Sequence, residues 1–125
     1  MGVSHWKRIM VKSSYIPNRG DFVWITFDPR KGHEQGGRRP ALVLSARTYN
    51  QRAGLALVCP VTSHKKGYPF EVIVSEKNVE GVVLADHIHS FDWKKRKAMY
   101  IQKATTETVE QVSRKVTVLL ANVTK

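Results

Sequence analysis

The residues best suited to chemistry lie in one polar segment, GHEQGGRRPALVLS, which spans residues 32–45. It brings a carboxylate, Glu34, and two guanidiniums, Arg38 and Arg39, to the start of an apolar run typical of a strand. Cleaving RNA through its own 2′-hydroxyl needs a proton acceptor, a cation for the phosphorane charge and a donor for the leaving 5′ oxygen. Glu34, Arg39 and a nearby hydroxyl could supply these without a metal. The alternative is that Glu34 and Arg39 form only a salt bridge within a loop.

The histidines give a weaker signal. Of the five, only His87 and His89 could share a metal ion, since alternate residues of a strand point to the same face. No third ligand is evident nearby, so we expect neither a metal site nor a cofactor. His33 and His64 fall in two polar loops, where they are either solvated or brought together at one cleft.

The amino-acid composition limits the classes of function that are compatible with the chain. The 125 residues include 21 Lys and Arg against 10 Asp and Glu, a formal net charge of +11. Both halves of the chain are basic, so we expect the fold itself to present a positive surface, either for solubility or for a polyanion such as nucleic acid. One cysteine allows no internal disulfide, and we find no secretory signal and no apolar run long enough to span a bilayer. We therefore expect a cytoplasmic protein.

The hydrophobic pattern predicts several short strands followed by one helix. Period-two or apolar runs predict strands over residues 21–27, 40–45, 55–61, 70–74, 82–88 and 98–102. Polar loops cover 28–39 and 62–67, and 46–52 can form a helical turn. From Val109 to Val123 the apolar period changes to three and four, with Thr105 or Thr106 as the helix cap. We expect an α+β, mostly β fold: a small curled antiparallel sheet with a C-terminal helix, formed by residues 15–125 as one domain after a loose extension over 1–14.

Several motifs together resemble one family. The segment GHEQGGRRPALVLS is followed by Tyr49-Asn50, by PVTS at 60–63, by KGYPFEV at 66–72 and by GVVLAD at 81–86. In this order and spacing they strongly resemble the MazF/PemK toxins, the ribosome-independent mRNA interferases of type II toxin–antitoxin modules. The resemblance runs from about residue 15 into the terminal helix.

The resemblance implies a fold, an activity and partners. The fold would be an SH3-like barrel of the PemK/CcdB type with a C-terminal helix, assembled as a homodimer that binds RNA in a groove at its interface. The activity would be sequence-preferring, metal-independent cleavage of single-stranded mRNA, leaving a 2′,3′-cyclic phosphate and a free 5′-hydroxyl. An acidic cognate antitoxin would be the protein partner. Two alternatives are a toxin of the same fold that acts on DNA gyrase, like CcdB, and an RNA-binding barrel without catalysis; the intact motifs around Arg39 and Thr62 favour the nuclease.

The resemblance also implies roles for individual residues. Arg39 falls on the family's essential arginine before proline and would transfer a proton and hold phosphate charge, while Thr62 would hold a non-bridging oxygen. Glu34 falls on the loop glutamate and would orient Arg39 or accept from the 2′-hydroxyl. The chain departs from the family at His87, where many relatives have glutamine. We expect further RNA contacts from Arg38, His33, Gln35, Ser63, His64, Lys65, Lys66 and His87.

Overall fold

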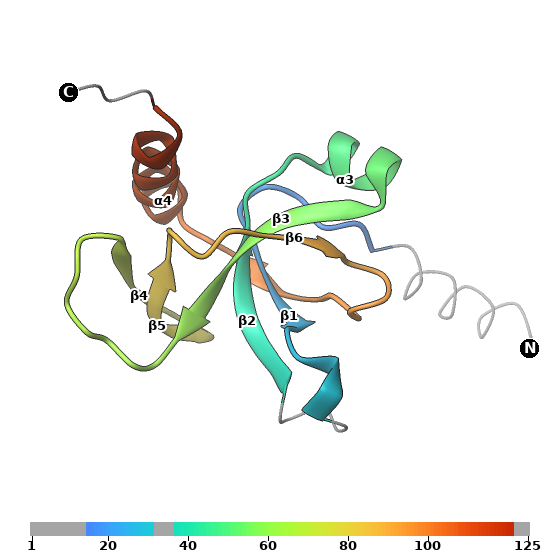
Figure 1. Ribbon diagram of the computed structural model, residues 1–125, viewed down its shortest axis with the longest axis horizontal. Coiled ribbons are helices and arrows are strands. Elements are labelled where there is room, and N and C mark those ends of the chain that lie inside the picture. Colours follow the sequence, from blue (N-terminus) through green and yellow to red (C-terminus); the bar gives the residue numbers. More distant parts are fainter. Residues whose placement is uncertain (1–14, 32–36, 122–125) are drawn as a thin grey trace, which may run out of the picture.

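Strands make up most of the computed structural model, which describes residues 15–31 and 37–121 (Figure 1). The strands are β1 (Asp21–Thr26), β2 (Arg38–Val43), β3 (Leu55–Thr62), β4 (Glu71–Glu76), β5 (Val79–Leu84), β6 (His89–Asp92) and β7 (Met99–Lys103). The helices are the 3-10 turn η1 (Pro29–Lys31), α3 (Arg47–Ala53) and α4 (Thr106–Leu120). The fold is therefore mostly β with a terminal helix, as the sequence pattern predicts.

All strand pairs are antiparallel, and they follow the order β4-β5-β3-β2-β1-β7. Strand β3 is the longest and has three partners. Its first residues pair with β6, its middle pairs with β2, and its last two residues, Val61 and Thr62, pair with β5. Figure 1 shows β3 running across the molecule from α3 toward the β4–β5 hairpin. The sheet curls because this one strand belongs to both of its parts.

Two apolar clusters fill the two sides of the curled sheet, and β1 contributes to both. Phe22 packs into one cluster with strands β4 and β5 and with Val112 of α4, while Val23 and Ile25 pack into the other with Phe91 and residues of β2 and β3. All three β1 side chains are fully buried. Burying a side chain of this size stabilises the fold by about 1.5–3 kcal/mol relative to exposing it.

Helix α4 is fixed at its first turn by a carboxylate from the sheet. Thr105 caps the helix, its hydroxyl accepting from the Thr108 backbone N–H at 3.2 Å. The carboxylate of Glu76, at the end of β4, accepts from the Thr108 hydroxyl at 2.7 Å, and from the Thr105 hydroxyl and backbone N–H at 3.2 Å each. An anion at a helix N-terminus also interacts favourably with the helix dipole. Glu76 thus sets where α4 begins over the sheet.

The prediction of one strand over 82–88 is wrong. Strand β5 starts earlier, at Val79, and ends at Leu84, after which a turn leads to β6, a strand that the sequence pattern does not reveal. His87 therefore lies outside any strand and does not share a strand face with His89. His89 instead packs on the rings of Phe27 and Phe91, with centroids 5.3 and 4.8 Å away. Desolvation, together with the nearby charges of His87 and Arg96, lowers the pKa of His89.

Two expectations from the sequence fall on residues that the structure does not describe. The extension over residues 1–14 and the predicted end of the helix at Val123 lie outside the described residues. In the described ranges, no helix is long and apolar enough to cross a membrane. Nor do three or more His, Cys, Asp or Glu side chains in these ranges come together as a metal-binding group.

The contacts of Glu76 predict a loss of stability when its carboxylate is removed. Glu76→Ala should lower the free energy of unfolding by about 2 kcal/mol, because hydrogen bonds to a charged group are worth about 1.5–3 kcal/mol and the α4 cap loses its partner. Urea unfolding followed by circular dichroism measures this. Glu107→Ala is the matched control, since Glu107 is an exposed acid of the same helix turn. Equal midpoints for the two variants would contradict the assigned role of Glu76.

Candidate active site

A cavity of about 390 Å³ opens where the start of β2 meets the end of β3 and the start of β5. Its wall is formed by Arg38, Arg39, Pro40, Val61, Thr62, Ser63, His64 and Glu80. The structure thus brings together the arginine and the threonine on which the sequence places the chemistry. Three of the expected RNA-contacting residues also line this cavity: Arg38, Ser63 and His64.

The two neighbouring arginines are in different situations. The Arg38 guanidinium donates to the Lys97 carbonyl at 2.7 Å and to the Thr26 hydroxyl at 2.9 Å, with longer bonds of 3.4 Å to the carbonyls of Trp24 and Arg96. The exposed Arg39 side chain makes no hydrogen bond or ion pair to any described residue. With respect to the described residues, the Arg39 donors are therefore available to a ligand, whereas four hydrogen bonds hold the Arg38 guanidinium to the fold.

The polar loop between β1 and β2 is anchored at its base. The Phe27 backbone N–H donates to the Gly37 carbonyl at 2.7 Å, and the Arg96 guanidinium donates to the carbonyls of Thr26 and Phe27 at 3.0 and 3.1 Å. Arg96 also stacks on the Phe91 ring, 3.9 Å from its centroid. A Cβ at Gly37 would stand 2.3 Å from a backbone carbonyl oxygen of this base, so only glycine fits there. These contacts fix the direction in which β2 presents Arg39.

Thr62 has a hydroxyl whose orientation is set by the turn that follows it. As the last residue of β3, it pairs with Val82, and its Oγ1 accepts from the His64 backbone N–H at 3.2 Å. A hydroxyl that accepts in this way still has its own proton to donate. The Thr62 hydroxyl can therefore donate to an oxygen of a ligand in the cavity.

The loop after Thr62 is organised by one carboxylate. Glu71 accepts from the backbone N–H of Lys66 at 3.0 Å and of Gly67 at 2.8 Å. Desolvation acts to raise the pKa of Glu71, but these two hydrogen bonds and the charges of Lys65 and Lys66 outweigh it and lower the pKa. The carboxylate thereby shapes the basic loop beside the cavity.

The other predicted site residues fall outside the cavity wall or outside the described chain. Lys65 and Lys66 are exposed in the loop beside the cavity but do not line it. His87 is also exposed and lies 3.8 Å from a carboxylate oxygen of Asp86. The predicted residues that lie outside the described ranges are His33, Glu34 and Gln35.

Glu80 is a cavity residue that the sequence reasoning missed. It stands on β5 in the stretch NVEGVV, two residues before the predicted start of the strand at 82. The available signal was the acidic residue directly before Gly81 and an apolar run, two residues from the predicted start of that strand. The pairing of this strand with Thr62 is not predicted by the pattern, so the sequence alone does not place Glu80 beside Thr62.

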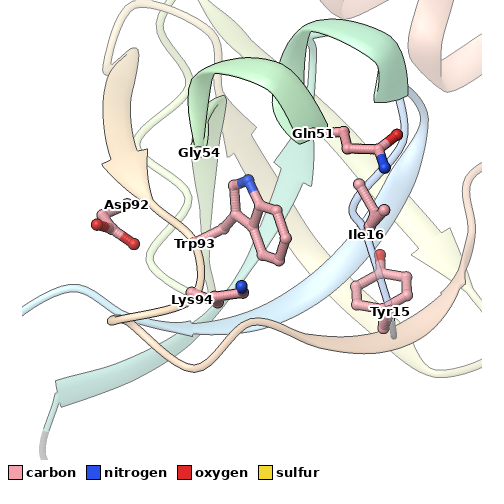
Figure 2. A pocket seen from close by; sticks show the side chains of 7 residues that line it. All are labelled: Tyr15, Ile16, Gln51, Gly54, Asp92, Trp93 and Lys94. Carbon is pink, nitrogen blue, oxygen red and sulfur yellow. The ribbon is translucent and has the colours of Figure 1, made fainter. Parts of the chain in front are cut away.

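A second cavity of about 390 Å³ lies between α3 and the turn after β6 (Figure 2). Its largest side chain is Trp93, whose Nε1 donates to the Asn50 carbonyl at 2.9 Å. Tyr15 closes another side and donates to a carboxylate oxygen of Asp21 at 2.7 Å; burial and this hydrogen bond raise the pKa of Tyr15. The Trp93 indole N–H and the Tyr15 hydroxyl are thus both bonded to residues outside the cavity wall, which makes the cavity a packing feature rather than a second reactive centre.

Comparisons with known proteins decide the family. The sequence profile of the family described as "PemK-like, MazF-like toxin of type II toxin-antitoxin system" matches residues 18–120. The chain belongs to this PemK/MazF toxin family. It is 44% identical over 108 residues to the endoribonuclease toxin MazF of Escherichia coli K12, covering 86% of this chain and 97% of that protein. The endoribonuclease toxin ChpB of the same organism is 42% identical, over 82% of this chain and 91% of its own.

Solved MazF structures have the same fold. Crystalline MazF from Deinococcus radiodurans superposes with a TM-score of 0.77 at 51% identity, covering 86% of this chain and 98% of that one. MazF in a MazE–MazF crystal structure from the same organism gives a TM-score of 0.76 at 45% identity, over 88% and 100% of the two chains. These matches confirm the predicted small MazF-type curled barrel with its C-terminal helix.

The lowered pKa of Glu71 predicts a pH-dependent loop in this MazF-like protein. Because the folded pKa lies below the ordinary glutamate value, the contribution of the carboxylate to the loop is complete above that value and is lost as the pH falls through the folded pKa. The amide proton shifts of Lys66 and Gly67 should therefore titrate together at acidic pH in NMR spectra. In Glu71→Gln the same amides should show no such titration. Persistence of the titration in that variant would assign it to another group.

Proposed function

We propose that this PemK/MazF family member is a toxin that cleaves single-stranded mRNA without a metal ion. The observation that carries the proposal is the shared cavity, in which Arg39 makes no hydrogen bond or ion pair to a described residue and the Thr62 hydroxyl accepts one hydrogen bond while its own proton can be donated. Its relatives in E. coli are named endoribonucleases, which supports the same reaction class here. They give no support to the alternative of a gyrase-directed toxin.

The chemistry follows from what each group can donate or accept. The 2′-oxygen attacks phosphorus, the 2′ proton passes to an acceptor, the bond from phosphorus to the 5′ oxygen breaks, and that oxygen takes a proton. The products are a 2′,3′-cyclic phosphate and a free 5′-hydroxyl, and no water is consumed. Arg39 holds the phosphorane charge with its planar fork of donors and delivers a proton, while Thr62 donates to a non-bridging oxygen. Glu34 accepts the 2′ proton or orients Arg39.

The RNA strand outside the reacting phosphate is held by the surrounding polar residues. Ser63 and His64 contact it from the cavity wall, and Lys65 and Lys66 contact phosphates from the adjacent loop. The remaining contacts of this proposal come from His33, Gln35, Arg38 and His87. Arg38 contributes mainly its positive charge, because most of its donors are occupied by backbone carbonyls.

The protein partners are those expected of a toxin in a two-component module. MazF of D. radiodurans is crystallised as a MazE–MazF complex, and a mycobacterial endoribonuclease is crystallised with its cognate antitoxin. By analogy this chain forms a homodimer in the cytoplasm and is inhibited there by an acidic cognate antitoxin. A net charge of +11 favours such a carboxylate-rich partner for the same reason that it favours RNA.

The proposed reaction predicts which substrate resists cleavage. Purified protein should cut a single-stranded RNA in excess chelator, and an otherwise identical strand with a 2′-deoxy sugar at the cut site should bind but remain intact, because the nucleophile is missing. Denaturing gels and end-group analysis of the products measure both. Cleavage of the deoxy substrate would exclude the cyclic-phosphate route.

Arg39 and Thr62 should be needed for cleavage but not for folding. Arg39→Ala should reduce turnover about 100- to 1000-fold, the usual effect of removing one preorganised charge donor, with an unchanged melting temperature because the side chain is exposed. Thr62→Ala should have a similar but milder effect. Arg114→Ala, on the exposed side of α4, is the charge-matched control. Near-normal turnover of Arg39→Ala would refute the role given to Arg39.

An acidic antitoxin should compete with RNA for the same surface. An acidic peptide from the cognate antitoxin should displace an uncleavable RNA from the protein, and the RNA should displace the peptide. Added salt should lower the affinity of both ligands, since both bind through charge. Fluorescence anisotropy with either ligand labelled measures the competition. Simultaneous binding with unchanged affinities would show that the two surfaces are separate.

A further inference from the structure

The cavity that holds Arg39 and Thr62 has one carboxylate in its described wall, that of Glu80. The β4–β5 pairing is regular from Glu76↔Val79 to Glu71↔Leu84, so alternate residues of β5 lie on one face. Glu80 therefore shares a face with Val82, which pairs directly with Thr62. Glu80 thus lies two residues along β5 from the partner of Thr62, on the same face of the sheet as the proposed phosphate site.

The backbone next to Glu80 is held against Thr62. Gly81 has a φ of +141°, and a Cβ at this position would lie 2.4 Å from the Thr62 carbonyl oxygen. Only glycine permits this approach and this backbone conformation. The same close contact that brings β5 to the end of β3 thus fixes where Glu80 projects relative to Thr62.

The Glu80 carboxylate has no polar partner in the described part of the chain. The exposed side chain makes no hydrogen bond or ion pair with any described residue, although Arg38, Arg39 and His64 line the same cavity. An unpaired carboxylate repels phosphates, so it weakens binding of a polyanion unless a part of the ligand donates to it. An ionised carboxylate is an acceptor only. The parts of an RNA strand that donate beside a phosphate are the 2′-hydroxyl and the amino and imino groups of the bases.

We propose that Glu80 selects the base next to the cleaved phosphate by accepting a hydrogen bond from its exocyclic amino group; this inference rests on the proposed ribonuclease activity. Adenine, cytosine and guanine each carry such a group, whereas the one N–H on the pairing edge of uracil, at N3, lies between two carbonyl oxygens, which a carboxylate repels. The cavity then has two chemically distinct walls. Arg39 and Thr62 attract the phosphate, and Glu80 repels phosphate and turns the base edge toward itself. Glu80 is a specificity-determining residue in this arrangement and takes no part in proton transfer.

The test compares base preference in matched variants. A random single-stranded RNA pool cleaved in chelator, with sequencing of the product ends, gives the preferred bases around the cut. Short RNAs that differ only at one position beside the cut then give kcat/KM for each base. The parent protein should cut the uracil substrate at least about fivefold more slowly than the substrate with the best amino-bearing base, the lower end of the range for one misread base. In Glu80→Gln this ratio should fall toward one at that position alone, because the amide can donate to uracil as well as accept.

The variant should also bind RNA more tightly, whatever its sequence, because a negative charge has been removed from the cavity. A merely structural role would not give looser selectivity together with an equal or lower KM. Glu110→Gln, which removes the same charge from an exposed position on α4, should leave both the preference and the KM unchanged.

Three outcomes would overturn the inference while leaving the ribonuclease assignment intact. These are an unchanged base preference in Glu80→Gln, an equal loss of turnover on all substrates with the preference retained, and a parent enzyme that prefers uracil at every position beside the cut. Absence of cleavage by the parent protein under any of these conditions would refute the proposed function, and the inference with it.

Discussion

The arrangement of the molecule depends on the pairing of β3 with three other strands. A strand that belongs to two parts of a sheet changes partners along its length, and here β6 pairs with β3 up to Val58 and β5 from Val61, while β2 pairs with the other edge as far as Pro60. Proline cannot donate a ladder hydrogen bond, so it is tolerated where one partner gives way to the next. Thr62 lies just beyond this point. The Thr62 hydroxyl, the basic loop and the edge of β5 all take their positions from the end of this one strand.

The adjacent arginines show how one dipeptide can serve both the fold and the ligand. Arg38 binds backbone carbonyls of segments that are 14 to 59 residues away in sequence, which ties β1, β2 and the turn before β7 together. Arg39 then projects from a strand whose start cannot shift. Preorganisation of this kind matters for charge stabilisation, since a donor that must first be ordered loses part of its effect. Conversely, a substitution at Arg38 acts on the site through the position of β2.

The sequence predicts the features that depend on neighbouring residues. It does not predict the features that depend on pairing with residues far away in the chain. The apolar period of α4, its threonine cap and the strand cores follow from neighbouring residues, and the placement of Arg39 and Thr62 follows from a motif. Strand β6 could not be predicted, because its four residues are defined by pairing with β3 more than thirty positions away. The same is true of Glu80, which enters the cavity only through the register of β5 against Thr62. Three of the four hydrogen bonds of Arg38 are to backbone carbonyls, and these leave no trace in the identity of the residues that supply them.

Cys59, the single cysteine of the chain, is fully buried in β3, and desolvation together with the charge of Asp86 raises its pKa to about 12. At neutral pH almost none of it is thiolate, the form that reacts with oxidants and alkylating agents. Burial and the raised pKa therefore make the Cys59 thiol a poor target for thiol-directed reagents in the folded protein. The same property makes the chain a convenient background for spectroscopy: a cysteine introduced at exposed Ser63 would be the one readily labelled thiol, placed on the wall of the cavity.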